Sequence, residues 1–149
     1  MMLKGVSPLL SPDLLWVLGA MGHGDDVVVV DRNFPGTAIA PETASGQLIR
    51  VQGAGEAELL QAILSVLQLD GFVEAPIVGM EVVGEPETEL PIHREMLAIA
   101  EAAEGRSLTL ERMERFAFYE AARSAFAIVQ CAEARPYGCF MLKKGVIFG

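Results

Sequence analysis

The sequence predicts an α/β domain in which helices cover both faces of a mixed sheet. Short apolar segments alternate with helical patterns over most of the 149 residues, as in layered α/β folds. A run of four valines at residues 27–30 is typical of a strand that is buried on both faces. The chain contains no internal repeat, low-complexity tract or long linker. We therefore expect a single domain over residues 1–149.

The first helix is expected over residues 12–21. Ser11 can cap its N-terminus, Pro12 suits the first helical position, and Asp13 lies favourably at the positive end of the helix dipole. Gly22 is expected to end this helix in a left-handed conformation. The valine strand and a short strand at residues 48–51 follow. Leucine and isoleucine at helical spacing then predict a second helix over residues 56–69.

The second half of the chain continues the alternation. A strand is expected over residues 77–83, just after Pro76, and a helix over residues 92–103. Thr109 is expected to cap the next helix, which runs to about residue 124. Strands over residues 125–131 and 139–142 complete the sheet. The short turn at residues 136–138 between them is compatible with antiparallel pairing of the two.

The acidic composition excludes several classes of partner. The 20 acidic residues outnumber the 11 basic ones and give a formal net charge of −9. Such a surface repels phosphate backbones and anionic lipid headgroups, so we expect neither a nucleic-acid nor a membrane partner. A neutral ligand suffers no such repulsion. The mean hydropathy of +0.38 is high for a small monomer and favours apolar surface that is buried between subunits.

The N-terminus and the cysteines favour a cytoplasmic protein. Pro8, Pro12 and Asp13 interrupt the apolar N-terminus, which lacks a basic segment followed by an apolar run. No stretch reaches the roughly 20 apolar residues of a membrane span. Cys131 and Cys139 have strand-like neighbours and form no CxxC pair, so two buried thiols are expected rather than a disulfide.

Two polar residues flank the valine strand. His23 lies between two glycines, which let the backbone approach a ligand closely, and histidine exchanges protons near neutral pH. Its alternative role is to bond the last carbonyls of the preceding helix. Asp31 directly follows the strand, where it can orient a ligand hydroxyl or the histidine, or can simply terminate the strand.

A second candidate region combines residues 115–120 with residues 135–139. Known cofactor and metal motifs are absent from the sequence. His23 and His93 belong to no HxH or HExxH spacing, and no GxGxxG, GxxxxGK[ST] or GxSxG occurs. We therefore expect neither a metal nor a cofactor. The phenylalanines at positions 116, 118 and 126 are expected to belong to the core.

The chain resembles the L-fucose mutarotase and D-ribose pyranase family over essentially the full length of the chain. Several motifs, in the same order along the sequence, carry this resemblance. They are LKG and SPLLSP at residues 3–12, MGHGD at 21–25, Asp31 with NFP at 33–35, RFAFYE at 115–120, Tyr137-Gly138, and LKKGV at 142–146. The resemblance implies a three-layer α/β/α domain around a mixed, mostly parallel sheet. It also implies a pentameric or decameric homo-oligomeric ring with sites near subunit boundaries.

The resemblance also implies roles for individual residues. It makes His23 the proton donor and Asp31 a ligand-binding acid. Arg115 opens the RFAFYE motif, and in having an arginine there the chain resembles the fucose-type members of the family. After Tyr-Gly the family has an asparagine, and this chain has Cys139 instead. The expected substrate-binding residues are Asp31, Arg115, Tyr119, Tyr137, Gly138 and Cys139.

These implications predict an isomerase that interconverts the α and β anomers of a free monosaccharide, with L-fucose expected. His23 would supply general acid/base catalysis of ring opening and closure. Two alternatives stay open. One is a non-catalytic sugar-binding or transport-accessory protein of the same fold, and the other is a metal-dependent hydrolase. Binding of fucose without faster anomer exchange would indicate the sugar-binding protein. Stoichiometric metal in the purified protein would indicate the hydrolase.

Overall fold

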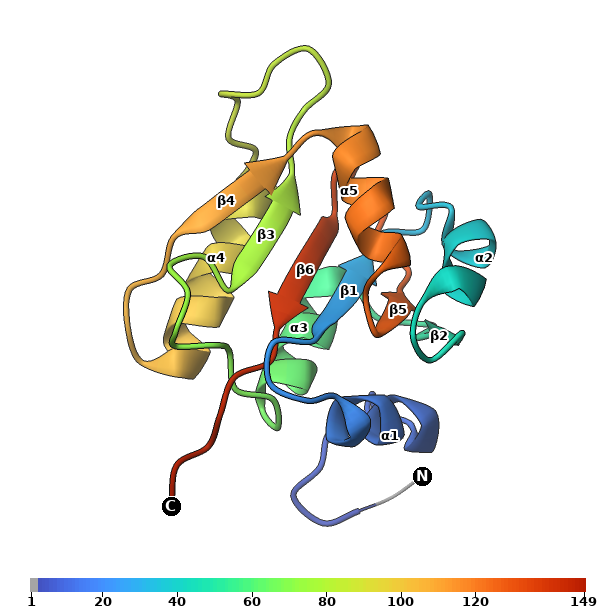
Figure 1. Ribbon diagram of the computed structural model, residues 1–149, viewed down its shortest axis with the longest axis vertical. Helices are drawn as coiled ribbons and strands as arrows, with labels where there is room; N and C mark the ends of the chain where they lie inside the picture. The colour runs from blue at the N-terminus through green and yellow to red at the C-terminus, as the bar shows by residue number, and fades with distance from the viewer. Residues whose placement is uncertain (1–2) are drawn as a thin grey trace.

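A six-stranded mixed sheet in the order β2-β5-β1-β6-β3-β4 forms the centre of the molecule (Figure 1). The computed structural model describes residues 3–149. Within this range β6 runs antiparallel to both of its neighbours, β1 and β3, while the remaining pairs are parallel. The predicted mixed, mostly parallel sheet is therefore confirmed. The strands are β1 (Asp26–Val30), β2 (Leu48–Arg50), β3 (Ile77–Met80), β4 (Leu110–Met113), β5 (Ala127–Gln130) and β6 (Cys139–Lys143).

Helices lie on both faces of this sheet and complete the three layers (Figure 1). One face is covered by α3 and α4, and the other by α5 with the short α2. The helix α1 lies near the amino edge of β1, below the sheet in the view of Figure 1. The helices are α1 (Pro12–Ala20), α2 (Gly36–Ile39), the 3₁₀ helix η1 (Ala40–Glu42), α3 (Glu56–Leu64), α4 (Pro91–Glu104) and α5 (Arg115–Arg123).

The valine strand joins the two halves of the core. Val27 and Val29 belong to the larger apolar cluster, which contains the buried residues of α1, α3 and α4. Val28 and Val30 belong to the smaller cluster with Phe118 of α5. Because side chains alternate along a strand, β1 is buried on both faces, as its sequence predicts.

The structure corrects the prediction for residues 109–124. Residues Leu110–Met113 form the edge strand β4, and Thr109 caps no helix. The helix α5 begins at Arg115, and its cap is Glu114, whose carboxylate accepts from the N–H of Ala117. An edge strand with one partly exposed face needs no continuous apolar run, and the segment LERM has none. Pairing with β3 therefore decides its conformation.

The prediction for the end of the first helix is also wrong. The helix α1 stops at Ala20 because Met21 adopts an extended conformation, with φ −58° and ψ 138°. The left-handed residue is Gly24, with φ +86°, and not Gly22. The ammonium group of Lys144 donates to the carbonyls of Leu18 and Met21, which satisfies the C-terminal end of the helix.

One strand pairing and two further element ends differ from expectation. The last two strands do not pair with each other, because β6 lies between β1 and β3 while β5 lies on the other side of β1. The helix expected over residues 56–69 ends at Leu64, and the strand expected over residues 77–83 ends at Met80. Both cysteines are buried free thiols, as predicted.

Candidate functional site

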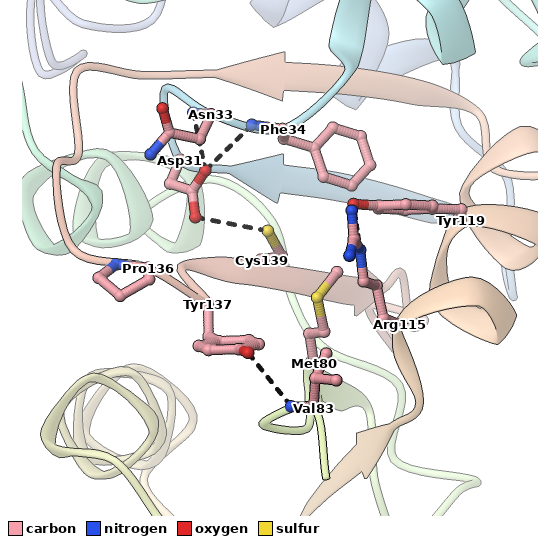
Figure 2. Close-up of a pocket in the computed structure, with 10 residues that line it drawn as sticks. All are labelled: Asp31, Asn33, Phe34, Met80, Val83, Arg115, Tyr119, Pro136, Tyr137 and Cys139. Carbon is pink, nitrogen blue, oxygen red and sulfur yellow. Dashed lines mark hydrogen bonds between the residues drawn. The ribbon is translucent and has the colours of Figure 1, made fainter.

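A cavity of about 250 Å³ opens at one edge of the sheet (Figure 2). This is the edge at which β1, β3 and β4 end and at which the antiparallel β6 begins. Ligands in open α/β sheets bind outside the carboxyl ends of the parallel strands. The cavity is lined by Asp31, Asn33, Phe34, Met80, Val83, Arg115, Tyr119, Pro136, Tyr137 and Cys139.

Asp31 connects the end of β1 with the turn before β6. Its Oδ1 accepts from the N–H groups of Asn33 at 2.9 Å and Phe34 at 3.1 Å. Its Oδ2 accepts from the N–H of Gly138 at 3.1 Å and from the thiol of Cys139 at 3.7 Å. Burial raises the pKa of Asp31, and these four donors act in the opposite direction. The carboxyl group thus holds the rear wall of the cavity together, in addition to facing the cavity.

Tyr137 forms one wall of the cavity in an uncommon backbone conformation. Its φ of 62° lies in the left-handed region, where residues other than glycine are rare. Hydrogen bonds on both sides hold it there. The N–H of Val83 donates to the Tyr137 hydroxyl at 3.1 Å, and the next residue, Gly138, is tied to Asp31.

Gly138 is required at its position by close approach. A Cβ atom there would collide with Glu56 Oε2 and would lie only 3.2 Å from Ile92 Cδ1 and 3.3 Å from Asp31 Cβ. Gly138 is buried and does not line the cavity itself. Its contribution is to let the Tyr137–Cys139 turn lie flat against the end of β1.

Arg115 and Tyr119 project from successive turns at the start of α5. The Nε–H of Arg115 donates to the Tyr119 hydroxyl at 3.0 Å, and the guanidinium carbon lies 5.5 Å from the Tyr119 ring centroid. Phe34 packs edge-on against Tyr119, with ring centroids 5.5 Å apart. Figure 2 shows this aromatic pair on the side of the cavity opposite Tyr137. The cavity therefore offers aromatic faces together with fixed hydrogen-bond donors.

Cys139 brings a thiol to the rear of the cavity. It is 3% exposed, and burial raises the pKa of this thiol well above its ordinary value. The thiol is therefore protonated at neutral pH and serves as a weak donor to Asp31.

His23 lies at the opposite edge of the sheet from this cavity. It precedes β1, whereas Asp31 follows it, so the five residues of the strand separate them. The expectation that Asp31 might orient this histidine is therefore wrong within one chain. The imidazole Nε2 lies 3.1 Å from Oδ1 of Asp70 instead. The structure brings together Asp31, Arg115, Tyr119, Tyr137, Gly138 and Cys139, and places His23 elsewhere.

Asp70 determines which imidazole nitrogen of His23 carries a proton. Hydrogen bonds from the N–H of Phe72 and from His23 hold the pKa of Asp70 below its usual range. Because Asp70 is then a carboxylate, His23 Nε2–H donates to it, and Nδ1 is left to accept a proton. The His23 side chain is 46% exposed, whereas that of Asp70 is 4% exposed.

Asp70 was not identified by sequence reasoning. It lies 47 residues from His23, and no short-range pattern connects the two positions. The cavity residues Met80 and Val83 were missed as well, because both were assigned to a strand. Their position at the carboxyl end of that strand was the available signal.

Over residues 3–149, no group of three or more histidine, cysteine, aspartate or glutamate side chains is placed to hold a metal ion. In the same range, none of the helices has the length and apolar character needed to cross a membrane.

Known proteins resemble the whole chain. Residues 4–147 match the RbsD / FucU transport protein family. The fucose mutarotase of Homo sapiens is 43% identical over 148 residues, which cover 97% of this chain and 94% of that protein. The L-fucose mutarotase of Actinobacillus pleuropneumoniae serotype 5b (strain L20) is 40% identical over 145 residues, or 97% of each chain.

A solved structure agrees with these sequence matches. The fucose mutarotase from Streptococcus pneumoniae in complex with L-fucose superimposes with a TM-score of 0.84 at 35% identity. The superposition covers 98% of this chain and 100% of that one.

Proposed function

Because this chain belongs to the RbsD / FucU transport protein family, we propose that it is a sugar mutarotase that interconverts the anomers of L-fucose. The observation that carries this proposal is full-length similarity, at 40–43% identity, to proteins named for that activity. The cavity supports this proposal, because it has aromatic walls and a volume of about 250 Å³. This volume is close to that of the smallest ligand pockets, about 300 Å³.

Anomer exchange in a free sugar requires two proton transfers. The anomeric hydroxyl loses a proton, the ring oxygen gains one, and the bond between C1 and the ring oxygen breaks to give an open-chain aldehyde. The carbonyl then presents its other face, and the same steps run in reverse. Only C–O and O–H bonds change, so the reaction needs no cofactor. One positioned acid/base group accelerates such a step by roughly 10²- to 10⁴-fold.

His23 is the residue we assign to proton transfer. Asp70 holds the proton on Nε2, so Nδ1 accepts the proton of the sugar hydroxyl and returns one to the ring oxygen. Asp70 also stabilises the imidazolium that forms between these two steps. The loop that carries His23 is fixed to the end of β6, since Gly24 N–H donates to the Lys144 carbonyl and Lys144 N–H to the Asp25 carbonyl.

The cavity residues are assigned to sugar binding. The guanidinium group of Arg115 uses its Nε–H on Tyr119, which leaves its terminal nitrogens to donate to sugar hydroxyls. The ring of Tyr137 offers an apolar face to the pyranose. Asp31 holds the Tyr137–Cys139 turn in place, and a sugar hydroxyl would bind to its Oδ2 by displacing the weak thiol donor of Cys139, which lies 3.7 Å away.

The position of His23 implies that two copies of the chain build one site. His23 of one copy would complete the cavity of the next, because the two lie at opposite edges of the same sheet. A contact between opposite edges is heterologous, and repeated heterologous contacts form a ring when the rotation between copies closes. We therefore propose a ring, with the pentameric or decameric size that the family resemblance implies.

Exposed apolar side chains at both edges support this head-to-tail contact. Around His23, Phe72 is 68% exposed, and Ile147 and Phe148 are 76% and 79% exposed. Phe72 lies against the imidazole, with ring centroids 5.3 Å apart. At the cavity edge, Val83 is 59% and Phe116 is 65% exposed. Burying such side chains between copies would remove them from water.

We place this activity in the cytoplasm. The supporting observation is that both cysteines are free thiols, the form maintained in reducing compartments.

Complementation between two inactive variants tests the enzyme and its shared site together. Saturation-transfer NMR measures anomer exchange of L-fucose for His23→Ala, for Arg115→Ala and for rings assembled from an equal mixture. At L-fucose concentrations well below KM, each variant alone should be nearly inactive. In the mixed rings about one quarter of the contacts pair an intact His23 with an intact cavity, so about a quarter of the wild-type rate should return. Mixed rings without any recovered activity would contradict a site shared between copies.

A non-catalytic sugar-binding protein is the second candidate. The observation that favours it is the position of His23, the proposed proton-transfer group, which lies at the opposite edge of the sheet from the cavity. Binding of L-fucose by the wild-type protein with no acceleration of anomer exchange would select this function.

A further inference from the structure

A buried carboxyl group behind the sugar cavity is left without a partner. Glu56 is the first residue of α3 and is 0% exposed. Neither of its carboxyl oxygens has a hydrogen-bond partner among residues 3–149. Buried polar side chains in native proteins are almost always hydrogen-bonded, so such a group requires an explanation. Glu56 has no part in the proton transfers proposed above.

Glu56 lies directly behind the turn that forms one wall of the cavity. A Cβ atom on Gly138 would collide with Glu56 Oε2 and would lie 3.3 Å from Asp31 Cβ. The N–H of Gly138 donates to Asp31 Oδ2 at 3.1 Å. Both carboxyl groups therefore approach the same glycine. Asp31 accepts the hydrogen bond from the N–H of Gly138. Glu56 occupies the space into which a side chain at position 138 would project.

The charges that face Glu56 are mostly negative. Asp31 at the end of β1, Glu133 after β5 and Glu95 on α4 are acidic, and Arg135 is basic. Arg135 is already paired, since it donates to both oxygens of Glu95 and to both oxygens of Glu133. The charge of Glu56 also raises the pKa of two neighbouring thiols, those of Cys131 and Cys139.

These surroundings favour the uncharged form of the Glu56 carboxyl group. Burial, followed by the charge of Asp31, raises the pKa of Glu56 well above its ordinary value. Burying a neutral acid without a partner costs far less than burying a carboxylate. Asp31 receives four donors, whereas Glu56 receives none from residues 3–149, so Asp31 is the group of the two that carries the charge.

We propose that Glu56 is a positioning residue of the sugar site, which as a neutral acid fills the space behind Gly138 and leaves Asp31 as the only negative charge against the Tyr137–Cys139 turn. This inference rests on the proposed function, because it treats that turn as a wall of the sugar site. Once Glu56 loses its proton at alkaline pH, a second charge repels Asp31, and no free donor receives it. The turn is then displaced, and sugar binding weakens as the pH rises.

The unfolding equilibrium tests whether Glu56 is neutral in the folded protein. The folded chain holds this proton, whereas the unfolded chain releases it above the ordinary glutamate pKa of about 4.3. Rising pH therefore favours the unfolded wild-type protein by up to about tenfold per pH unit relative to Glu56→Gln, which has no such proton. Urea unfolding measures this difference. Glu56→Met, which is apolar and of similar length, provides a second neutral variant in case the amide is poorly accommodated.

The sugar site is tested by the affinity for L-fucose from about pH 6 to about pH 9. Binding is measured so that the result does not depend on proton transfer by His23. The ratio of the Glu56→Gln affinity to the wild-type affinity should be near one at the acid end and should rise to about tenfold at the alkaline end. Glu58→Gln makes the same change at an exposed position of α3 and should match the wild type throughout.

Two results would overturn the positioning role. One is an affinity ratio that stays constant over this pH range. The other is a wild-type unfolding equilibrium with the same pH dependence as that of both neutral variants, which would mean that folded Glu56 is ionised. Failure of the proposed function is distinguishable from these outcomes. A wild-type protein that binds L-fucose without exchanging its anomers would contradict the mutarotase, while a rising affinity ratio in the same protein would still support the role of Glu56.

Discussion

His23 and Asp70 form a hydrogen-bonded pair at the amino edge of the sheet, with Nε2 and Oδ1 3.1 Å apart. The Asp70 side chain is 4% exposed, whereas the imidazole is 46% exposed. The buried partner therefore fixes the imidazole ring, and the accessible partner is the one that would meet the sugar in the proposed mechanism. This division of roles resembles the orienting acid beside a catalytic histidine in other enzymes.

Asp70→Asn should slow anomer exchange of L-fucose by about 10²-fold or more. An amide can donate to Nε2, which moves the imidazole proton to Nδ1 and removes the base that faces the sugar. Saturation-transfer NMR measures the rate. Glu74→Gln, an exposed acid in the same loop, serves as the control and should retain wild-type exchange. A wild-type rate in Asp70→Asn would exclude Asp70 from the mechanism.

Arg115→Lys should weaken sugar binding. The guanidinium group lies over Tyr119 and keeps its terminal nitrogens for the ligand, and a lysine cannot do both. We expect KM for L-fucose to rise about tenfold, because a hydrogen bond to a charged donor contributes about 1.5 kcal/mol. Arg123→Lys alters an arginine on the same helix that pairs with Glu42 and Glu120, and its KM should not change. An unaltered KM in Arg115→Lys would place the arginine outside the sugar site.

Gly138→Ala should destabilise the fold by about 1–3 kcal/mol, the usual cost of inserting a methyl group into a packed site. The new methyl group would collide with Glu56 and press on Ile92 and Asp31. Urea unfolding measures the loss. The same change at Gly71, which has no neighbouring atom within 4 Å of the added carbon, should have little effect. Equal stabilities for the two variants would show that the turn can move away from the end of β1.

Glu133→Gln should lower stability at neutral pH but not in strong acid. Arg135 holds the pKa of Glu133 at about 2, below the value of about 4.3 expected in the unfolded chain. The ionised Glu133 therefore stabilises the folded protein at pH values above the unfolded-state pKa. This stabilisation disappears as the pH falls toward the folded-state pKa. Because the Arg135 side chain is 42% exposed, we expect only about 1–2 kcal/mol at pH 7. A stability difference between wild type and variant that does not shrink on acidification would contradict this assignment.

The central part of the fold could be predicted because its residues carry a local signal. Four successive valines specify a buried strand, and Ser11 with Pro12 specifies a helix start; both predictions are confirmed. The edge strand β4 could not be predicted in this way. Its four residues are partly or fully exposed, and they form a strand only because β3 pairs with them.

The site likewise contains residues that the sequence reveals and residues that it does not. Residues near the ends of strands, such as Asp31 and Tyr137, are recognisable because topology brings such positions to one edge of a sheet. The partnership of His23 with Asp70 depends on two loops that are 47 residues apart, so no spacing rule reveals it. Glu56 looks in the sequence like an ordinary first-turn acid of a helix, and only the packed core shows that its carboxyl group is buried.

The reversed direction of β6 would link neighbouring sites in the proposed ring. This strand begins at the Tyr137–Cys139 turn and ends at Lys143 and Lys144, which bind the loop of His23. In a head-to-tail ring each copy of β6 would thus reach from one catalytic centre to the adjacent one. The strand is hydrogen-bonded along both sides in the middle of the sheet, and packed interiors deform little. Successive centres would therefore sit at a constant spacing without influencing each other, and saturation with L-fucose should be hyperbolic.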